Sequence, residues 1–191
     1  ILQGLSDPVL RSMAMLEKDM LDAVIAGRDG RRVLIKAHPK FPATIATAPA
    51  EALAAAHEGV EMVDANLHDL LEGAYCSVSI CSGACFEGLF HRTPAVLFGR
   101  ADFAACAWNV ESAEEGKRAL REVGQTTFEY ERFLYWFLQR KMFNAQDDAL
   151  VDRVIHRIAR TGFDLGVSSA LDAPKVGIGR IRTGGSKTGQ V

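Results

Sequence analysis

Short apolar runs alternate along this chain with segments of helical periodicity, and this alternation constrains the fold more than any other feature. The runs expected to be strands are Ile1–Leu5, Val33–Ile35, Val60–Val63, Tyr75–Ile80 and Ala95–Phe98. Helical patterns lie between them, with short connections. Strands that alternate with helices form a parallel sheet with helices on both faces. The sequence therefore predicts an α/β domain with about five parallel strands.

The expected helices continue beyond the last of these strands. Four precede it, and they are 9–25, 50–57, 68–72 and 82–91. Three follow Gly99, and they are 111–123, the aromatic-rich 128–143 and 147–160. Residues 173–191 contain almost no large apolar side chain and are expected to be disordered. We therefore expect a sheet domain over residues 1–125, helices over 126–162 that pack on it or on a missing N-terminal half, and a disordered tail over residues 173–191.

Composition excludes several classes of protein. Of the 191 residues, 48% are hydrophobic and 24% charged, and the net charge is −2. These values are typical of a globular chain and argue against a collagen-like, disordered or dedicated nucleic-acid-binding protein. No apolar run approaches the roughly 20 residues of a membrane span. The four cysteines do not resemble a disulfide framework, so we expect reduced thiols and a cytoplasmic location.

The turn Ser82-Gly83 is the most informative candidate for a binding site. It follows a predicted buried strand and begins a predicted helix, whose free N–H groups and partial positive charge favour a phosphate. Gly83 lacks a side chain, so a phosphate is able to approach the backbone. The alternative is that Ser82 only caps the helix. Glu87, one turn later, is a candidate for binding ribose hydroxyls, or else a surface carboxylate that complements the helix dipole.

Other candidates follow the remaining strands at the same expected edge of the sheet, where ligands of open parallel sheets bind. His38 and Pro39 form a stiff turn after Val33–Ile35, and Lys36 adds a positive charge there. Gln3 lies where the first expected strand meets this edge. The alternative for His38 is an ordinary, partly exposed side chain. Cys81, Cys85 and His91 match no common zinc spacing, so no metal site is predicted.

The order of these motifs resembles the capsule polysaccharide biosynthesis family. The resemblance rests on "VLIKAHP", on "VEMVDANLHDLLEGAYCSVSICSGACFEGLFHRTPAVLFGRADF" and on "YERFLYWFLQR", and it extends from residue 1 to about residue 160. Members of this family look like glycosyltransferases with two Rossmann-like halves, the GT-B arrangement, and include bacterial Kdo transferases that use CMP-Kdo. The resemblance implies that this chain is the C-terminal, donor-binding Rossmann-like half.

The resemblance also implies roles for the candidate residues. His38 would act in catalysis and, with Pro39, Ser82 and Gly83, hold the donor phosphate, which Lys36 would support. Glu87 would bind the ribose, and Gln3 would border the site. Two departures from the family pattern are Gly88, where an Ala is usual, and Cys81, where a more polar residue is usual. Neither removes an expected contact.

The expected partners follow from the same resemblance. They are a CMP-Kdo donor, a polysaccharide or lipid-linked acceptor, an acceptor-binding half expected to precede Ile1, and capsule assembly proteins at the inner membrane. No cofactor is expected, because a nucleoside monophosphate can leave without a metal. Three alternatives stay open: a UDP-sugar transferase or epimerase, a non-catalytic scaffold acting through the aromatic segment 128–143, and an unrelated Rossmann-like domain.

Overall fold

Two small parallel sheets form the centre of the chain. The structure is a computed structural model and describes residues 17–37 and 47–163. Strand β1 (Val33–Ile35) pairs in parallel with β2 (Val60–Met62), and Val33 lies opposite Val60. In the second sheet, β4 (Ala95–Leu97) lies between β3 (Ser77–Ser79) and β5 (Trp108–Asn109), again with parallel pairing. The predicted parallel α/β architecture is confirmed, but the described strands are divided between two sheets.

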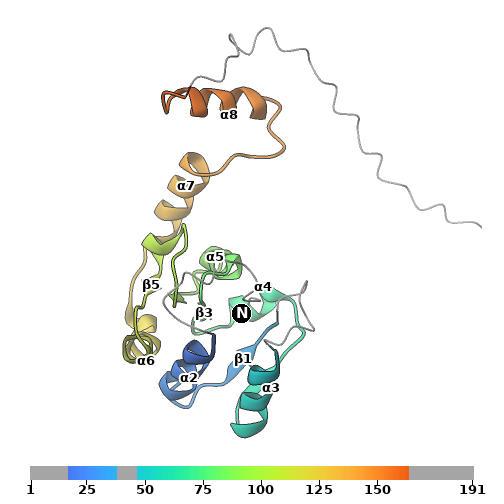
Figure 1. The fold of residues 1–191 in the computed structure, drawn as a ribbon, viewed down its shortest axis with the longest axis vertical. Coiled ribbons are helices and arrows are strands. Elements are labelled where there is room, and N and C mark those ends of the chain that lie inside the picture. The colour runs from blue at the N-terminus through green and yellow to red at the C-terminus, as the bar shows by residue number, and fades with distance from the viewer. Residues whose placement is uncertain (1–16, 38–46, 164–191) are drawn as a thin grey trace, which may run out of the picture. The chain divides into compact units, whose positions relative to one another are not determined.

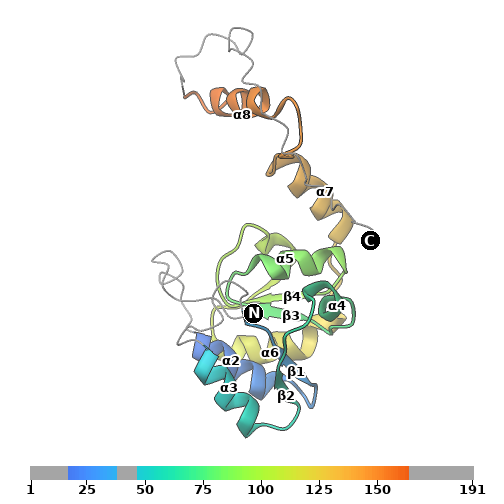
Figure 2. The ribbon, with the colours of Figure 1, turned by 90° about the vertical axis from the view of Figure 1, so that its right-hand side faces the viewer.

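Helices flank these strands, as the sequence predicts. In chain order, the helices of the part up to Lys141 are α2 (Glu17–Gly27), α3 (Thr47–Ala56), α4 (Leu67–Glu72), α5 (Gly83–Phe90), α6 (Ala113–Glu122) and α7 (Tyr130–Arg140). Figures 1 and 2 show that α5 and α6 lie on opposite sides of β3 and β4. Short 3₁₀ turns at Ala104–Cys106 and Val123–Gln125 complete the connections.

Strand β4 shows why this arrangement is stable. All three of its residues are buried, so the strand is covered on both faces, as is typical of a parallel sheet. Val96 and the following Phe98 pack into an apolar cluster with α2 and α6, whereas Ala95 and Leu97 pack into a second cluster with α5. Successive side chains of a strand point to opposite faces, and this alternation divides the core into two layers.

Local capping fixes where several helices begin. Asn66, Ser82 and Ser112 are the N-caps of α4, α5 and α6, and each side chain accepts a hydrogen bond from a backbone N–H of its helix. In α6, the Glu115 carboxylate also accepts from the N–H of Glu111 at 3.0 Å. These bonds satisfy amide groups that the first turn of a helix leaves unpaired.

The aromatic segment 128–143 has one buried and one exposed face. On α7, Tyr130 and Phe137 are buried, and the Phe137 ring lies 5.1 Å from that of Phe86 on α5. Tyr135 and Trp136 are exposed on the same helix. One face of α7 is therefore core, whereas its other face is open to solvent.

Residues 142–191 form a separate unit, of which residues 142–163 are described. Its helix α8 (Leu150–Ala159) has no buried residue. Asp147 precedes α8, where its carboxylate accepts from the Ala149 N–H at 3.0 Å and pairs with Arg153 at 2.8 Å. The helix expected over 147–160 is thus present, but it begins at Leu150, after the turn that Asp147 holds. The expected tail 173–191 and the expected strand Ile1–Leu5 lie outside the described residues.

Candidate functional site

The carboxyl end of β3 leads directly into the turn Ser82-Gly83 and helix α5. Ser82 is buried, with 5% of its surface exposed, and has an extended backbone (φ −67°, ψ 137°). Its hydroxyl accepts a hydrogen bond from the Ala84 N–H at 3.3 Å. Its carbonyl accepts from the Cys85 N–H at 3.0 Å. Ser82 is therefore the N-cap of α5, as one of the two interpretations of the sequence predicts.

The buried hydroxyl of Ser79 anchors this turn to the end of β3. Ser79, the last residue of β3, is fully buried, and its Oγ accepts a hydrogen bond from the Ser82 N–H at 3.0 Å. The Cys85 thiol donates to the same oxygen at 3.1 Å. The strand end, the cap and the first helical turn are thus tied together through one oxygen atom. A turn anchored in this way presents its remaining amide in a fixed direction.

Gly83 supplies that remaining amide. The residue is exposed, and a Cβ added to it would meet no atom within 4 Å. Within the described ranges, no group accepts a hydrogen bond from the Gly83 N–H. The first helical residue therefore offers an open donor at the positive end of the helix dipole, which is an arrangement that suits an anionic oxygen.

Glu87 has a partner on a neighbouring helix. Its carboxylate lies 3.4 Å from Nε2 of His68 on α4, and both side chains are about half exposed. Nδ1 of His68 lies 2.9 Å from Nε2 of His91, the C-cap of α5. Both ring nitrogens of His68 are thus engaged. The chain Glu87–His68–His91 therefore links α4 to α5, with the donor and acceptor roles of each imidazole set by its tautomer.

Lys36 lies just beyond β1 with its side chain largely buried, and its ammonium group is 3.7 Å from the exposed carboxylate of Asp64, which follows β2. The predicted positive charge at this strand end is therefore present, but it has an acidic partner. The remaining predicted site residues, Gln3, His38 and Pro39, lie outside the described residues.

Two elements of this site were missed by the sequence interpretation. His68 was assigned to a helix start, which α4 confirms, but its link to Glu87 was not predicted. The four-residue spacing of Glu87 and His91 was a usable signal, because such residues share a helix face. Asp64 was also missed. In the described part of the chain, no group of three or more His, Cys, Asp or Glu side chains is placed to hold a metal ion.

No family model, curated protein or solved structure matches the chain in the comparisons made. The geometry of the site therefore carries the functional argument. Over residues 17–37 and 47–163, no helix has the length and apolar character needed to cross a membrane.

Proposed function

We propose that this chain is the donor-binding, Rossmann-like half of a GT-B glycosyltransferase of bacterial capsule or surface polysaccharide synthesis. Its donor would be CMP-Kdo, and its acceptor a polysaccharide or lipid-linked glycan. A preceding half would bind that acceptor and supply the general base that deprotonates its hydroxyl group. The protein would act in the cytoplasm, beside capsule assembly proteins at the inner membrane. The observation that carries the proposal is the open Gly83 N–H at the start of α5, held by the Ser79–Ser82 contact.

The proposed mechanism is displacement of the nucleotide from the activated sugar. Negative charge grows on the phosphate as the glycosidic bond to it breaks, so donors fixed in advance at that position stabilise the transition state. The Gly83 N–H and the dipole of α5 would supply one such contact, and the imidazole of His38, positioned by the adjacent Pro39, would supply another. Lys36 would contribute if the phosphate replaced Asp64 as its partner.

Glu87 fits the proposed ribose contact in one respect and constrains it in another. It is half exposed, so a ligand is able to reach it. A ribose hydroxyl that donates to Glu87 would share or replace the contact with His68. His68 would still be held through His91, so α4 and α5 would stay linked when the nucleotide binds.

The test is calorimetric titration of the chain with CMP, UDP and ADP, repeated on Gly83→Pro. Proline is well accepted at the first helical position, and the extended backbone of Ser82 suits a residue before proline. The substitution therefore removes the open N–H while keeping the helix. Loss of a hydrogen bond to a charged group costs about 1.5–3 kcal/mol, so the Kd for CMP should rise roughly 10- to 100-fold.

Ala113→Pro is the matched control. Ala113 is the first residue of α6, and its N-cap Ser112 is also extended (φ −146°, ψ 158°). This variant should bind CMP as the parent chain does. His38→Ala should weaken CMP binding as well. Tight CMP binding that neither Gly83→Pro nor His38→Ala changes would refute the proposed site, and the absence of binding to any nucleotide would refute donor binding by this chain.

The exposed face of α7 favours the scaffold alternative. Tyr135 is 71% exposed and Trp136 45%, and large exposed aromatic side chains are typical of interaction surfaces. A scaffold would retain its partner binding in Gly83→Pro and lose it in a double variant, Tyr135→Ser with Trp136→Ser. A preference for UDP in the titration would instead support the UDP-sugar alternative.

A further inference from the structure

Gly83, Glu87 and His91 follow one another along α5 and its C-cap at intervals of four residues. Residues four apart lie on the same side of a helix, about 6 Å apart along its axis. The open Gly83 N–H and the Glu87 carboxylate are therefore one turn apart on one side of α5. With 46% of its side chain exposed, Glu87 is within reach of a bound molecule. The imidazole of His68 approaches the same side from α4.

The backbone fixes the positions from which the two imidazoles extend. His68 is in the first turn of α4, and its N–H donates to Oδ1 of the N-cap Asn66 at 2.9 Å. The N–H of His91 donates to carbonyls of the last turn of α5. The Thr93 hydroxyl donates to the Leu71 carbonyl at 2.6 Å, and this buried bond holds α4 against the segment that follows α5. The imidazole pair therefore lies between two anchored helix ends.

The distances around His68 determine which nitrogen carries each proton in the neutral imidazoles. An ionised carboxylate attracts an N–H and repels a lone pair, so Nε2 of His68, 3.4 Å from Glu87, carries the proton. A neutral imidazole has one N–H, so Nδ1 of His68 is an acceptor. Nε2 of His91, 2.9 Å from that nitrogen, is then the donor. The N–H groups of both rings therefore point along one chain, from His91 through His68 to Glu87.

We propose that His91 and His68 position Glu87, and that this makes the site selective for ribonucleotides over 2′-deoxyribonucleotides. The inference rests on the proposed function and adds a specificity to it. His91 fixes the tautomer of His68, and His68 holds Oε2 of Glu87. A carboxylate has about four lone-pair sites on its two oxygens, so sites remain for the two neighbouring hydroxyls of a ribose. Glu87 is thus the residue that contacts the ligand, and the two histidines are positioning residues.

The size of the expected selectivity follows from the hydroxyl that a 2′-deoxyribose lacks. Loss of a hydrogen bond to a charged group lowers affinity about 10- to 100-fold. A site built to bind a hydroxyl also rejects the analogue without it. Calorimetric titration of the full chain should therefore show CMP binding about 10- to 100-fold more tightly than 2′-deoxy-CMP. In Glu87→Ala the two Kd values should agree to within about threefold.

Two substitutions of His91 separate positioning from packing. His91→Gln keeps a side-chain N–H that is able to reach Nδ1 of His68, whereas His91→Leu removes it. We expect His91→Leu to lower the ratio of the two Kd values by about threefold or more, and His91→Gln to keep it within about twofold of the parent ratio. A purely structural role of His91 would change both Kd values by the same factor and leave their ratio as it was.

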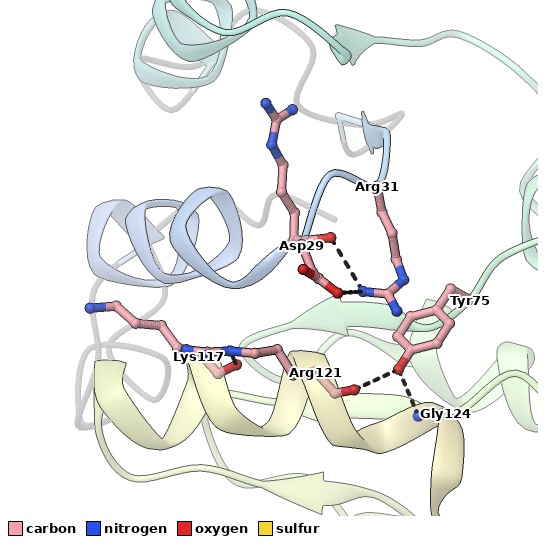
Figure 3. Close-up of polar contacts among 7 residues, drawn as sticks. Asp29, Arg31, Tyr75, Lys117, Arg121 and Gly124 are labelled. Atoms are coloured by element: carbon pink, nitrogen blue, oxygen red, sulfur yellow. Dashed lines mark hydrogen bonds and ion pairs between the residues drawn. The ribbon is translucent and has the colours of Figure 1, made fainter.

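Tyr75→Phe is the matched control, because it removes polar contacts at the other end of β3. The Tyr75 hydroxyl donates to the Arg121 carbonyl at 3.0 Å and accepts from the Gly124 N–H at 3.1 Å. Figure 3 shows these contacts and the Arg31 guanidinium, which lies 3.9 Å from the centre of the Tyr75 ring. This variant should lower stability and leave the ratio of the two Kd values unchanged.

Nitrogen-15 NMR of the imidazole rings tests the proton positions without a nucleotide. At about pH 8.5, above the usual titration range of histidine, His68 and His91 should both carry the proton on Nε2. A proton held mainly on Nδ1 of His68 would overturn the inference. So would a ratio of Kd values that His91→Leu leaves unchanged while Gly83→Pro still weakens CMP binding, and in that case the proposed function would stand. A chain that binds no CMP would overturn the proposed function and this inference together.

Discussion

Replacing Gly116 of α6 with alanine should destabilise the protein, although the same change in an ordinary helix stabilises it. A Cβ built at Gly116 would lie 2.5 Å from Cζ and 2.6 Å from Cε1 of Phe98. Phe98 is only 1% exposed, and Ala23 of α2 lies 3.6 Å from the same added atom. Because the ring is buried, the added atom can be accommodated only if the ring or the packed helices shift. Helix propensity alone predicts the opposite sign.

The expected magnitude is a balance of two effects. Alanine gains about 0.5–1 kcal/mol over glycine within a helix. Overpacking a close-packed core costs about 1–3 kcal/mol. With contacts as short as these, we expect a net loss of about 1–2 kcal/mol, which lowers Tm by about 2–8 °C in a chain of this size. Urea unfolding followed by circular dichroism measures the loss directly.

Two controls make the result specific to the contact with Phe98. Gly73→Ala, at the C-cap of α4, adds a Cβ with no atom within 4 Å and should leave stability nearly unchanged. In a Phe98→Leu background, Gly116→Ala should cost much less than in the parent chain, since the ring is gone. If Gly116→Ala raised the free energy of unfolding in the parent chain, the close packing of α6 on β4 would be refuted.

Two further changes test Tyr75 and Cys76, which lie just before β3. Tyr75→Phe removes the hydrogen bonds to Arg121 and Gly124 and should cost about 1 kcal/mol, because water is able to replace part of each bond; Tyr135→Phe, at a 71% exposed position, is the control for thermal unfolding and should cost nothing measurable. Burial raises the pKa of Cys76 to about 12. Since the unfolded thiol loses its proton near pH 8.5, stability should fall between about pH 9 and 12 by up to about 1.4 kcal/mol per pH unit, and Cys76→Ala should show a smaller slope. An equal slope in both chains would contradict the partly buried placement of this thiol.

Local patterns predict the elements of this fold well. The run Val-Leu-Ile gives β1 at its predicted bounds, and α3, α5 and α6 begin within three residues of their predicted starts. Each of these signals is local: an apolar run, a periodic stripe or a capping serine. Strand β5 was missed because Trp108 and Asn109 carry no strand pattern of their own. They are a strand only because β4 offers them an edge.

The contacts of the site depend on long-range packing and were predicted less well. Asn66 caps α4 and is readable from the sequence, whereas the contact of His68 with Glu87 joins side chains on different helices. The pairing of Lys36 with Asp64 likewise requires β1 and β2 to be adjacent. Sequence patterns place each of these groups at a strand or helix end, but the partner of each group is decided by how those ends assemble.

The two interpretations of Ser82 and Gly83, a helix cap and a phosphate contact, are compatible with each other. The Ser82 hydroxyl is committed to the Ala84 N–H, and the Ser82 N–H is committed to Ser79. A phosphate would therefore find its donor in the backbone of Gly83 rather than in the serine side chain. The cap and the open amide depend on the same contacts, because the hydrogen bonds made by Ser82 also hold Gly83 in place. Ser82→Ala should for this reason act mainly on stability, by about 1 kcal/mol, and Gly83→Pro mainly on nucleotide affinity.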